Sequence, residues 1–343
     1  MKNYHSYILQ DENAVYFEIG YSCDNEIFLS IGDERFFITD ARYEIEAKLF
    51  IKNCEVIISN DLIAQAITIL KKYKVKKLHF DPNDFTVFTY ESLKNKLDLK
   101  FIPKQNFSKI KRLIKTDDEI KLIKKAMSLG RDGFKRFSKY LQKDGLYKSE
   151  KFLFFKAKEF MSNSGELDLS FDPIVAINQN SAKPHALPTK KKLMQDDLLL
   201  VDAGVKYKRY CSDRTCTSFV DKNINFKREQ EFSSKKQQKI YDIVLKAQQT
   251  AISKARVGMK ASYIDKLARE VIEKSGYGKY FVHSTGHGVG LDIHEYPNIN
   301  SKNDVIIEDN MVFTIEPGIY LNDKFGVRIE DTVVMKKGRA VVL

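Results

Sequence analysis

The chain has 343 residues, 43% of them hydrophobic and 30% charged, as is usual for a soluble globular protein of about two domains. Its longest apolar runs, such as Leu198–Val201, are far too short to cross a bilayer, so we expect no membrane partner. The formal net charge of +12 is compatible with nucleic-acid binding, but the lysines are spread through nearly every predicted helix and loop, so we expect no nucleic-acid partner either.

The opening residues, MKNYHSYILQDENAV, lack the apolar core and small-residue cleavage site of a signal peptide. The four cysteines form no CxxC pair, and a chain of this length needs no disulfide to hold its core. We therefore expect reduced thiols and a cytoplasmic protein.

The first hundred residues alternate short apolar runs with helical patterns. Their β-branched and aromatic residues predict strands over EIFLSIG, ERFFITD, CEVIIS and KKLHFD. Asn60 or Asp61 can cap an amphipathic helix over LIAQAITILKKY, and TYESLKNKL predicts another helix. This alternation predicts an α/β domain, which we assign to residues 1–113.

The pattern changes near residue 112, and we assign residues 114–343 to a second domain. Thr116 stands three positions ahead of Glu119 before an apolar-periodic run, a capping-box pattern that predicts a long helix. Helical segments continue to about Ser162.

From Leu167 onward the pattern turns to strands, which predicts an α+β domain. Helices are predicted at about 239–255 and 262–275, and Gly276 is a plausible stop for the second. The lysine-rich run 222–239 is interpreted as a solvated loop.

A first hairpin is predicted in DDLLLVDAGVKYKRYCSDRTCTSFV. A turn centred between Tyr207 and Lys208 would place Asp202 directly opposite Asp213, although Gly204 could introduce a bulge. Facing residues of an antiparallel pair have Cβ atoms about 4.5–5.5 Å apart, where like charges repel. A cation is therefore expected between the two acids.

A second hairpin, NMVFTIEPGIYLNDKFGVRIEDTVVM, repeats the arrangement, with Glu316 and Glu330 symmetric about Asp323. Pro317 and Gly318 interrupt its first strand and bend the chain near the acid. The apolar neighbours in LLLVDAG and FTIEPG suggest that the acids are buried, where unpaired carboxylates would protonate or cost several kcal/mol. A divalent metal removes this cost.

The segment HSTGHGVGLDIHE holds three of the six histidines, His283, His287 and His294. Its glycines predict an extended or looped backbone, and HExxH is absent, which excludes the helical zinc-protease motif. One histidine could complete an oxygen-rich site while the others act on substrate. Four carboxylates and one imidazole suit Mn, Co or Zn, and they fit two ions about 3.5–4 Å apart better than one.

The order of these residues closely resembles that of the pita-bread metallopeptidases, in the proline-specific branch of Xaa-Pro aminopeptidases and prolidases. The order is Asp202, Asp213, His287 in GHGVG, Glu316 in EPG and Glu330 in RIED. HSTGHGVGLDIHE matches the signature of that branch, and FFITDARY resembles the creatinase-type N-terminal domain. The resemblance implies a creatinase-like α/β domain followed by an α+β pita-bread catalytic domain, and a homodimer.

The resemblance also implies a role for each site residue. Asp213 and Glu330 would bridge two divalent ions, Asp202 would hold one, and His287 with Glu316 the other. A metal-bridging water or hydroxide would attack the scissile carbonyl, Glu316 would shuttle the proton, and His294 would stabilise the tetrahedral intermediate. Manganese is the expected metal, with cobalt or zinc as alternatives.

Substrate residues are assigned by the same resemblance. His185 in NSAKPHALPT lies seventeen positions before Asp202, which is the family's spacing for a substrate-side histidine. His283, Tyr320 and Arg328 match positions that line the proline pocket. Arg328 could instead form a salt bridge to a ligand carboxylate.

The chain departs from the family pattern in one place. The family usually reads SD-x-T-R-T after the second aspartate, whereas this chain reads SDRTCT, so Arg214 is shifted and Cys216 occupies the arginine position. Asp213 is unchanged, so we expect an effect on the surroundings of the ligands rather than on metal binding. The following stretch, 221–234, is also longer and more charged than the fold needs.

We expect a dinuclear metal-dependent exopeptidase that acts on proline-containing peptides. The leading hypothesis is an Xaa-Pro aminopeptidase and the alternative an Xaa-Pro dipeptidase (prolidase), which differ in whether residues after proline are tolerated. A methionine aminopeptidase is disfavoured because those enzymes usually lack the extra α/β domain. Metal-free, creatinase-like hydrolysis and a non-catalytic binding module are disfavoured because all five ligand positions are filled.

Overall fold

The structure, a computed structural model, describes residues 5–343. The chain divides into two compact units, Met1–Arg112 and Leu113–Leu343. Within the described residues, no helix has the length and apolar character to cross a membrane.

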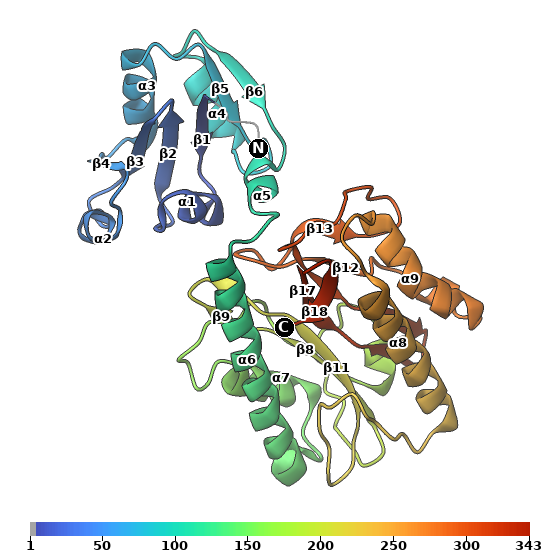
Figure 1. The fold of residues 1–343 in the computed structure, drawn as a ribbon. Helices are drawn as coiled ribbons and strands as arrows, with labels where there is room; N and C mark the ends of the chain where they lie inside the picture. The colour runs from blue at the N-terminus through green and yellow to red at the C-terminus, as the bar shows by residue number, and fades with distance from the viewer. Residues whose placement is uncertain (1–4) are drawn as a thin grey trace. The chain divides into compact units, whose positions relative to one another are not determined.

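The first unit is built on a six-stranded mixed sheet (Figure 1). Its strands are β1 (Ser6–Leu9), β2 (Glu26–Ile31), β3 (Glu34–Thr39), β4 (Glu55–Ile58), β5 (Lys77–Phe80) and β6 (Lys100–Pro103), in the spatial order β4-β3-β2-β1-β5-β6. Its helices are α1 (Glu12–Ile19), α2 (Glu44–Phe50), α3 (Leu62–Lys72), α4 (Val87–Lys94) and α5 (Phe107–Lys111).

Helices cover both faces of this sheet because its side chains alternate between them. Ile27 and Leu29 of β2 pack with α3 and α4, whereas Phe28, between them, packs with α1 and α2. Asp61 caps α3 through a hydrogen bond from Ala64 N at 2.9 Å, as predicted. The predicted α/β class of this unit is confirmed.

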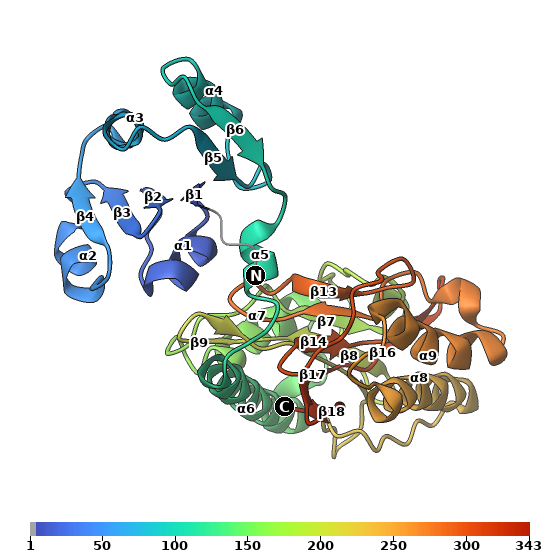
Figure 2. The same ribbon diagram turned by 45° about the horizontal axis from the view of Figure 1, so that its top comes forward.

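The second unit is larger and contains three-stranded and five-stranded sheets (Figure 2). Its strands are β7 (Ile174–Ile177), β8 (Leu198–Ala203), β9 (Lys206–Tyr207), β10 (Tyr210–Cys211), β11 (Arg214–Phe219), β12 (Gly286–Gly288), β13 (Glu295–Ile299), β14 (Val312–Ile315), β15 (Gly318–Leu321), β16 (Phe325–Arg328), β17 (Asp331–Lys336) and β18 (Arg339–Val342). Its helices are α6 (Asp117–Tyr140), which ends in a π turn at Leu141–Gly145, α7 (Glu150–Met161), α8 (Lys235–Lys254) and α9 (Ala261–Lys274). Short 3-10 turns lie at Asn178–Ala182 and Gly278–Tyr280.

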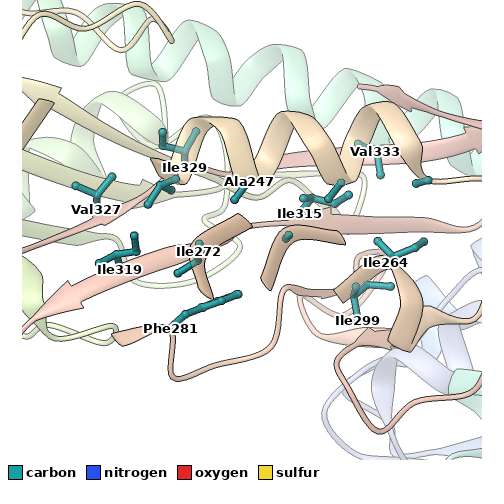
Figure 3. Packing of buried hydrophobic residues seen from close by; sticks show 14 of the residues in the cluster. Ala247, Ile264, Ile272, Phe281, Ile299, Ile315, Ile319, Val327, Ile329 and Val333 are labelled. Carbon is teal, nitrogen blue, oxygen red and sulfur yellow. The ribbon is translucent and has the colours of Figure 1, made fainter. Parts of the chain in front are cut away.

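Two hydrophobic cores organise this unit. One joins α6 and α7 to the sheet β11-β8-β7, and the other joins α8 and α9 to the sheet β13-β12-β14-β17-β18 and the hairpin β15-β16. Figure 3 shows the second core, in which Ile315 and Ile329 are buried one position before each of the two predicted glutamate ligands. The hydrogen bond from Arg328 N to Thr217 Oγ1, at 3.2 Å, ties β16 to β11 and so joins the two halves.

The helix boundaries of this unit follow the predicted signals closely. Thr116 Oγ1 accepts from Glu119 N at 3.2 Å and the Glu119 carboxylate accepts from Thr116 N at 2.8 Å, so the capping box is confirmed. Gly276 follows α9 with φ +83°, as its proposed role as a stop requires. The α+β class is confirmed.

The prediction of a solvated loop over 222–239 is wrong. α8 already begins at Lys235, and Ile224, Phe226 and Phe232 are buried. Ile224 and Phe226 pack into the core of α6 and α7, whereas Phe232 packs into the core of α8 and α9. Three apolar anchors therefore fix this charged segment across both halves of the unit.

Candidate metal centre

The first predicted hairpin exists, but its register is shifted. Tyr207 pairs with Tyr210, so the turn is centred between Lys208 and Arg209, which have φ of +48° and +70°. The same register continues in β8 and β11, where Asp202 pairs with Thr215. The prediction that Asp202 directly faces Asp213 is therefore wrong by two residues.

The second hairpin has the predicted register. Ile315 pairs with Asp331 on one side of the proline interruption and Gly318 pairs with Arg328 on the other. Both pairs are symmetric about Asp323, so Glu316 and Glu330 occupy equivalent positions between them. The interruption by Pro317 thus leaves the register of the two strands unchanged.

The glycine-rich segment puts His287 of β12 opposite a bulge in β13. Gly286 pairs with Ile299 and Gly288 with Glu295, so the partner strand β13 carries extra residues at this point. A Cβ atom on Gly286 would collide with the Thr314 carbonyl oxygen, and one on Gly288 would collide with the Tyr296 carbonyl oxygen. The backbone around His287 lies so close to its neighbours that only glycine fits on either side.

Four acids and His287 line one cavity of about 570 Å³. His287 Nε2 lies 3.5 Å from Asp213 Oδ2 and 3.4 Å from Glu316 Oε1. Asp213, His287 and Glu330 each offer one ligand atom, and these three atoms lie within 4.8 Å of one another. Asp202 also lines the cavity, held by Arg328 Nη2 at 2.7 Å from its Oδ2.

The donor set fits divalent cations. Asp202 Oδ1 and Glu330 Oε1 are buried and have no hydrogen-bond partner among residues 5–343. Burial, and then the charges of neighbouring acids, raises the pKa of Asp213 and of Glu330 well above the usual range. Burial likewise raises the pKa of Glu316 to about 8. Buried carboxylates with so few positive groups around them are expected where a bound metal ion supplies the positive charge.

His287 has the protonation state that a metal ligand requires. Burial lowers its pKa, so the ring is neutral near pH 7. Its Nδ1 lies 3.0 Å from the Gly288 carbonyl oxygen, which can only accept, so Nδ1 carries the proton. The lone pair is therefore on Nε2, which faces the acids, and a backbone carbonyl fixes the ring from the other side.

Four of the five other predicted residues line the same cavity, and the fifth, Tyr320, does not. His185, His283, His294 and Arg328 line it. The ring of His294 lies 4.3 Å from that of His287, centroid to centroid. Tyr320 is buried behind this wall, and its hydroxyl lies 2.8 Å from His283 Nε2 and 2.9 Å from Arg328 Nη1.

Arg328 is fully engaged by the protein. Besides Asp202 and Tyr320, its guanidinium donates to the Pro184 carbonyl oxygen at 3.1 Å and to Thr215 Oγ1 at 3.0 Å. The salt bridge to a ligand carboxylate, the alternative interpretation of this residue, is thus present. Arg328 also lines the cavity, so the interpretation that it lines the proline pocket is compatible with this salt bridge.

His283 is fixed as a neutral acceptor. Burial, helped by the charge of Arg328, lowers its pKa to about 4. Its Nδ1 lies 2.7 Å from the Ser284 carbonyl oxygen and must donate there. Nε2 therefore accepts a hydrogen bond from the Tyr320 hydroxyl. A directed chain of hydrogen bonds therefore runs from Arg328 through Tyr320 to His283.

Two threonines that we did not predict hold the acids in place. Thr215 Oγ1 donates to Glu330 Oε2 at 2.7 Å, and Thr314 Oγ1 donates to Glu316 Oε1 at 3.2 Å. Thr314 lies two positions before Glu316, which it holds, whereas Thr215 lies two positions after Asp213 and holds Glu330; residues two apart on an extended chain share a face. That spacing is the signal by which they could have been found.

Comparison with known protein families follows the division of the chain. Residues 2–120 match the Creatinase/Prolidase N-terminal domain, and residues 121–337 match Metallopeptidase family M24. The chain belongs to metallopeptidase family M24. It is therefore a metallopeptidase, and the predicted order of two domains is confirmed.

Individual relatives place the M24 chain in the proline-specific branch. It is 33% identical over 330 residues to the uncharacterized peptidase YqhT of Bacillus subtilis, covering 96% of this chain and 90% of the relative. A solved Xaa-Pro dipeptidase from Bacillus anthracis aligns with TM-score 0.91 and 33% identity over 98% of this chain and 92% of its own. An X-Pro aminopeptidase from Thermotoga maritima aligns with TM-score 0.86 and 30% identity over 98% and 94%. The resemblance stated from the sequence is confirmed.

Proposed function

We propose that this M24 peptidase hydrolyses the bond between an N-terminal residue and proline, using two divalent ions. The observation that carries the proposal is the cluster of three buried carboxylates, the partly buried Glu316 and a neutral imidazole around one cavity. The ions would be held by Asp202, Asp213, His287, Glu316 and Glu330. When bound, they would supply Lewis-acid activation of the scissile carbonyl and of the attacking water.

Glu316 is suited to move a proton. Its carboxyl group lines the cavity beside the other proposed ligands, and a carboxyl group in that place can both accept and release a proton. Thr314 holds Oε1 at 3.2 Å. We assign to Glu316 the transfer of the proton from the attacking water to the proline nitrogen that leaves.

His294 and His185 face the same cavity without belonging to the cluster of three ligand atoms. His294 would donate to the oxygen of the tetrahedral intermediate, and His185 would act on the substrate side. The hydrogen-bonded chain of Arg328, Tyr320 and His283 would form a rigid wall of the proline pocket, because each of its donors already has an acceptor.

The similarity to an Xaa-Pro dipeptidase with TM-score 0.91 changes the order of the two candidate activities. We place Xaa-Pro dipeptidase first and Xaa-Pro aminopeptidase second. The second keeps support from the cavity volume of about 570 Å³, which is within the range of sites that hold ligands larger than a dipeptide. Manganese as the native metal, a homodimer and a cytoplasmic location stay predictions.

The test compares an Xaa-Pro dipeptide with an Xaa-Pro-Xaa tripeptide after chelation and re-addition of manganese. Metal-dependent cleavage of the dipeptide alone supports a prolidase, and cleavage of the tripeptide supports an aminopeptidase. An Xaa-Ala dipeptide is the matched control for proline specificity. Absence of cleavage of both proline peptides would contradict the proposal.

A further inference from the structure

Asp331 is a buried acid directly after the proposed ligand Glu330, and its side chain is 9% exposed. Its Oδ2 accepts a hydrogen bond from Gln248 Nε2 at 2.7 Å. The same oxygen forms a salt bridge with Arg228 Nη2. A fifth carboxylate so near the metal centre requires a cation, because the surrounding acids already repel one another.

The cation comes from the charged stretch 221–234 rather than from the strand beside Asp331. In the family pattern an arginine stands on that strand, at the position occupied here by Cys216. Arg214, two positions earlier, directs its Nη2 to the Phe226 carbonyl oxygen at 3.3 Å. Among residues 5–343, Arg228 is the one cation within salt-bridge distance of Asp331.

Cys216, Arg228 and Asp331 line one small cavity of about 10 Å³. The Cys216 thiol lies 3.7 Å from the Phe226 carbonyl oxygen. The short side chain on the strand thus contacts the loop that carries Arg228, and the guanidinium of Arg228 reaches Asp331 from that loop.

The loop holds Arg228 firmly enough to position its partner. The Tyr241 hydroxyl of α8 donates to the Arg228 carbonyl oxygen at 2.8 Å. Phe226 and Phe232, on either side, are buried in the two different cores. Gln230 also donates to the Lys227 carbonyl oxygen at 2.8 Å. The backbone at Arg228 is thus anchored on both sides.

Glu330 is held by contacts on either side of the strand. Its backbone N–H donates to the Thr215 carbonyl oxygen at 3.1 Å, and Thr215 Oγ1 donates to its Oε2 at 2.7 Å. Asp331, the first residue of β17, fixes the backbone directly after it. We propose that Arg228 is a positioning residue for the metal centre, which aligns Glu330 by holding Asp331 in place of an arginine on β11. This inference rests on the proposed role of Glu330 as a ligand.

The test measures manganese affinity, with no substrate present. The chelated protein is titrated with Mn²⁺, and the free ion is followed by electron paramagnetic resonance. Arg228→Ala is expected to weaken binding about 10–100-fold, the usual effect of losing a partner that orients a ligand. Lys227→Ala removes the same charge from the neighbouring exposed position and is expected to leave the affinity unchanged. Arg228→Lys, which keeps the charge, is expected to fall between the wild type and Arg228→Ala.

A rescue variant makes the test specific. Cys216→Arg in the Arg228→Ala background is expected to recover most of the manganese affinity, whereas Cys216→Arg alone is expected to destabilise the protein because Arg228 already fills the space. Thermal unfolding of the metal-free variants checks that each is folded.

Equal affinity of Arg228→Ala and wild type, or an equal loss in Lys227→Ala, would overturn the inference. If the double variant Cys216→Arg/Arg228→Ala bound Mn²⁺ as weakly as Arg228→Ala, an arginine at position 216 could not replace Arg228, and that part of the inference would be overturned. If the wild type itself bound no Mn²⁺, the proposed function would fail instead.

Discussion

At the scale of single residues, the metal centre is defined by an imbalance of charge. Threonine hydroxyls donate to Glu316 and Glu330 and Arg328 donates to Asp202, and two oxygen atoms of these acids have no hydrogen-bond partner within the described residues. The excess of negative charge is found at the residues that would bind metal and not at the residues that would only contact substrate. Substitutions in the two groups should therefore have different consequences.

Asp213→Ala and His294→Ala separate the two groups. Asp213→Ala is expected to lose both metal and activity, because Asp213 is one of the three clustered candidate ligands. His294→Ala is expected to retain the metal and to lower kcat by about 10²–10³-fold, the scale of one oxyanion donor. Metal content per chain and kcat are measured together, with the exposed Asp144→Ala as control. Loss of metal from His294→Ala would show that His294 is a ligand.

The pH dependence of the metal-free protein follows from Glu316. Its folded-state pKa is about 8, against an ordinary value of 4.5, so the folded state binds this proton more tightly than the unfolded state. Stability from this group is present below about pH 4.5 and is lost as the pH rises towards about 8. Asp213 and Glu330 are shifted in the same direction.

We therefore expect the Tm of the chelated protein to fall between about pH 5 and pH 8, and added Mn²⁺ to raise it more at the higher pH. Thermal unfolding at both pH values, with and without metal, measures this. Glu316→Gln is expected to flatten the slope of the metal-free protein. A slope that is unchanged in this variant would contradict the assignment to Glu316.

At the scale of elements, the sequence predicted one hairpin register and missed the other for a local reason. Glu316 and Glu330 were placed correctly because the turn at Asp323 is symmetric. The first turn lies at Lys208 and Arg209, both with positive φ, and neither residue type signals such a turn as Asn-Gly would. The candidate ligands could still be proposed, because their order along the chain does not depend on the register.

The element that carries His287 is held by contacts that leave no room for a Cβ atom. Gly286→Ala would push β12 away from the Thr314 carbonyl oxygen, so we expect a loss of about 3 kcal/mol or more in unfolding free energy and weaker metal binding. Gly258→Ala is the control, because its site is open but has φ +87°, which costs about 1–2 kcal/mol. Urea unfolding and metal titration measure both variants. Equal losses in the two would mean that close packing at Gly286 is unimportant.

At the scale of the whole molecule, the two halves of the catalytic unit are joined at the site rather than beside it. The Arg328 guanidinium contacts β8 through Asp202 and β11 through Thr215, so a residue that lines the cavity also holds the halves together. The sequence indicated the order of the domains and the set of candidate ligands, which stays a prediction. The sequence did not indicate that residues 221–234 connect the two halves. The apolar residues that anchor this stretch lie among charged residues and show no periodicity.

One more long-range contact connects the beginning of this unit to the histidine segment. Lys115 Nζ lies 2.8 Å from Glu295 Oε2, 180 positions away, and both side chains are 1% exposed. Glu295 directly follows His294, and its Oε1 also accepts a hydrogen bond from Asp292 N at 3.2 Å. Removing one partner of a buried ion pair costs about 3–5 kcal/mol because the other charge remains buried.

Lys115→Met is therefore expected to lower the unfolding free energy by about 3–5 kcal/mol and to reduce kcat while metal content stays unchanged. Lys121→Met, which breaks the exposed pair with Asp118, is the matched control and is expected to cost far less, because solvent screens that pair. Adding Glu295→Gln to Lys115→Met should recover part of the loss, because the uncompensated charge is gone. Urea unfolding of the metal-free proteins measures all three. A Lys115→Met variant no less stable than Lys121→Met would show that this contact neither stabilises the catalytic unit nor orders the loop that carries His294.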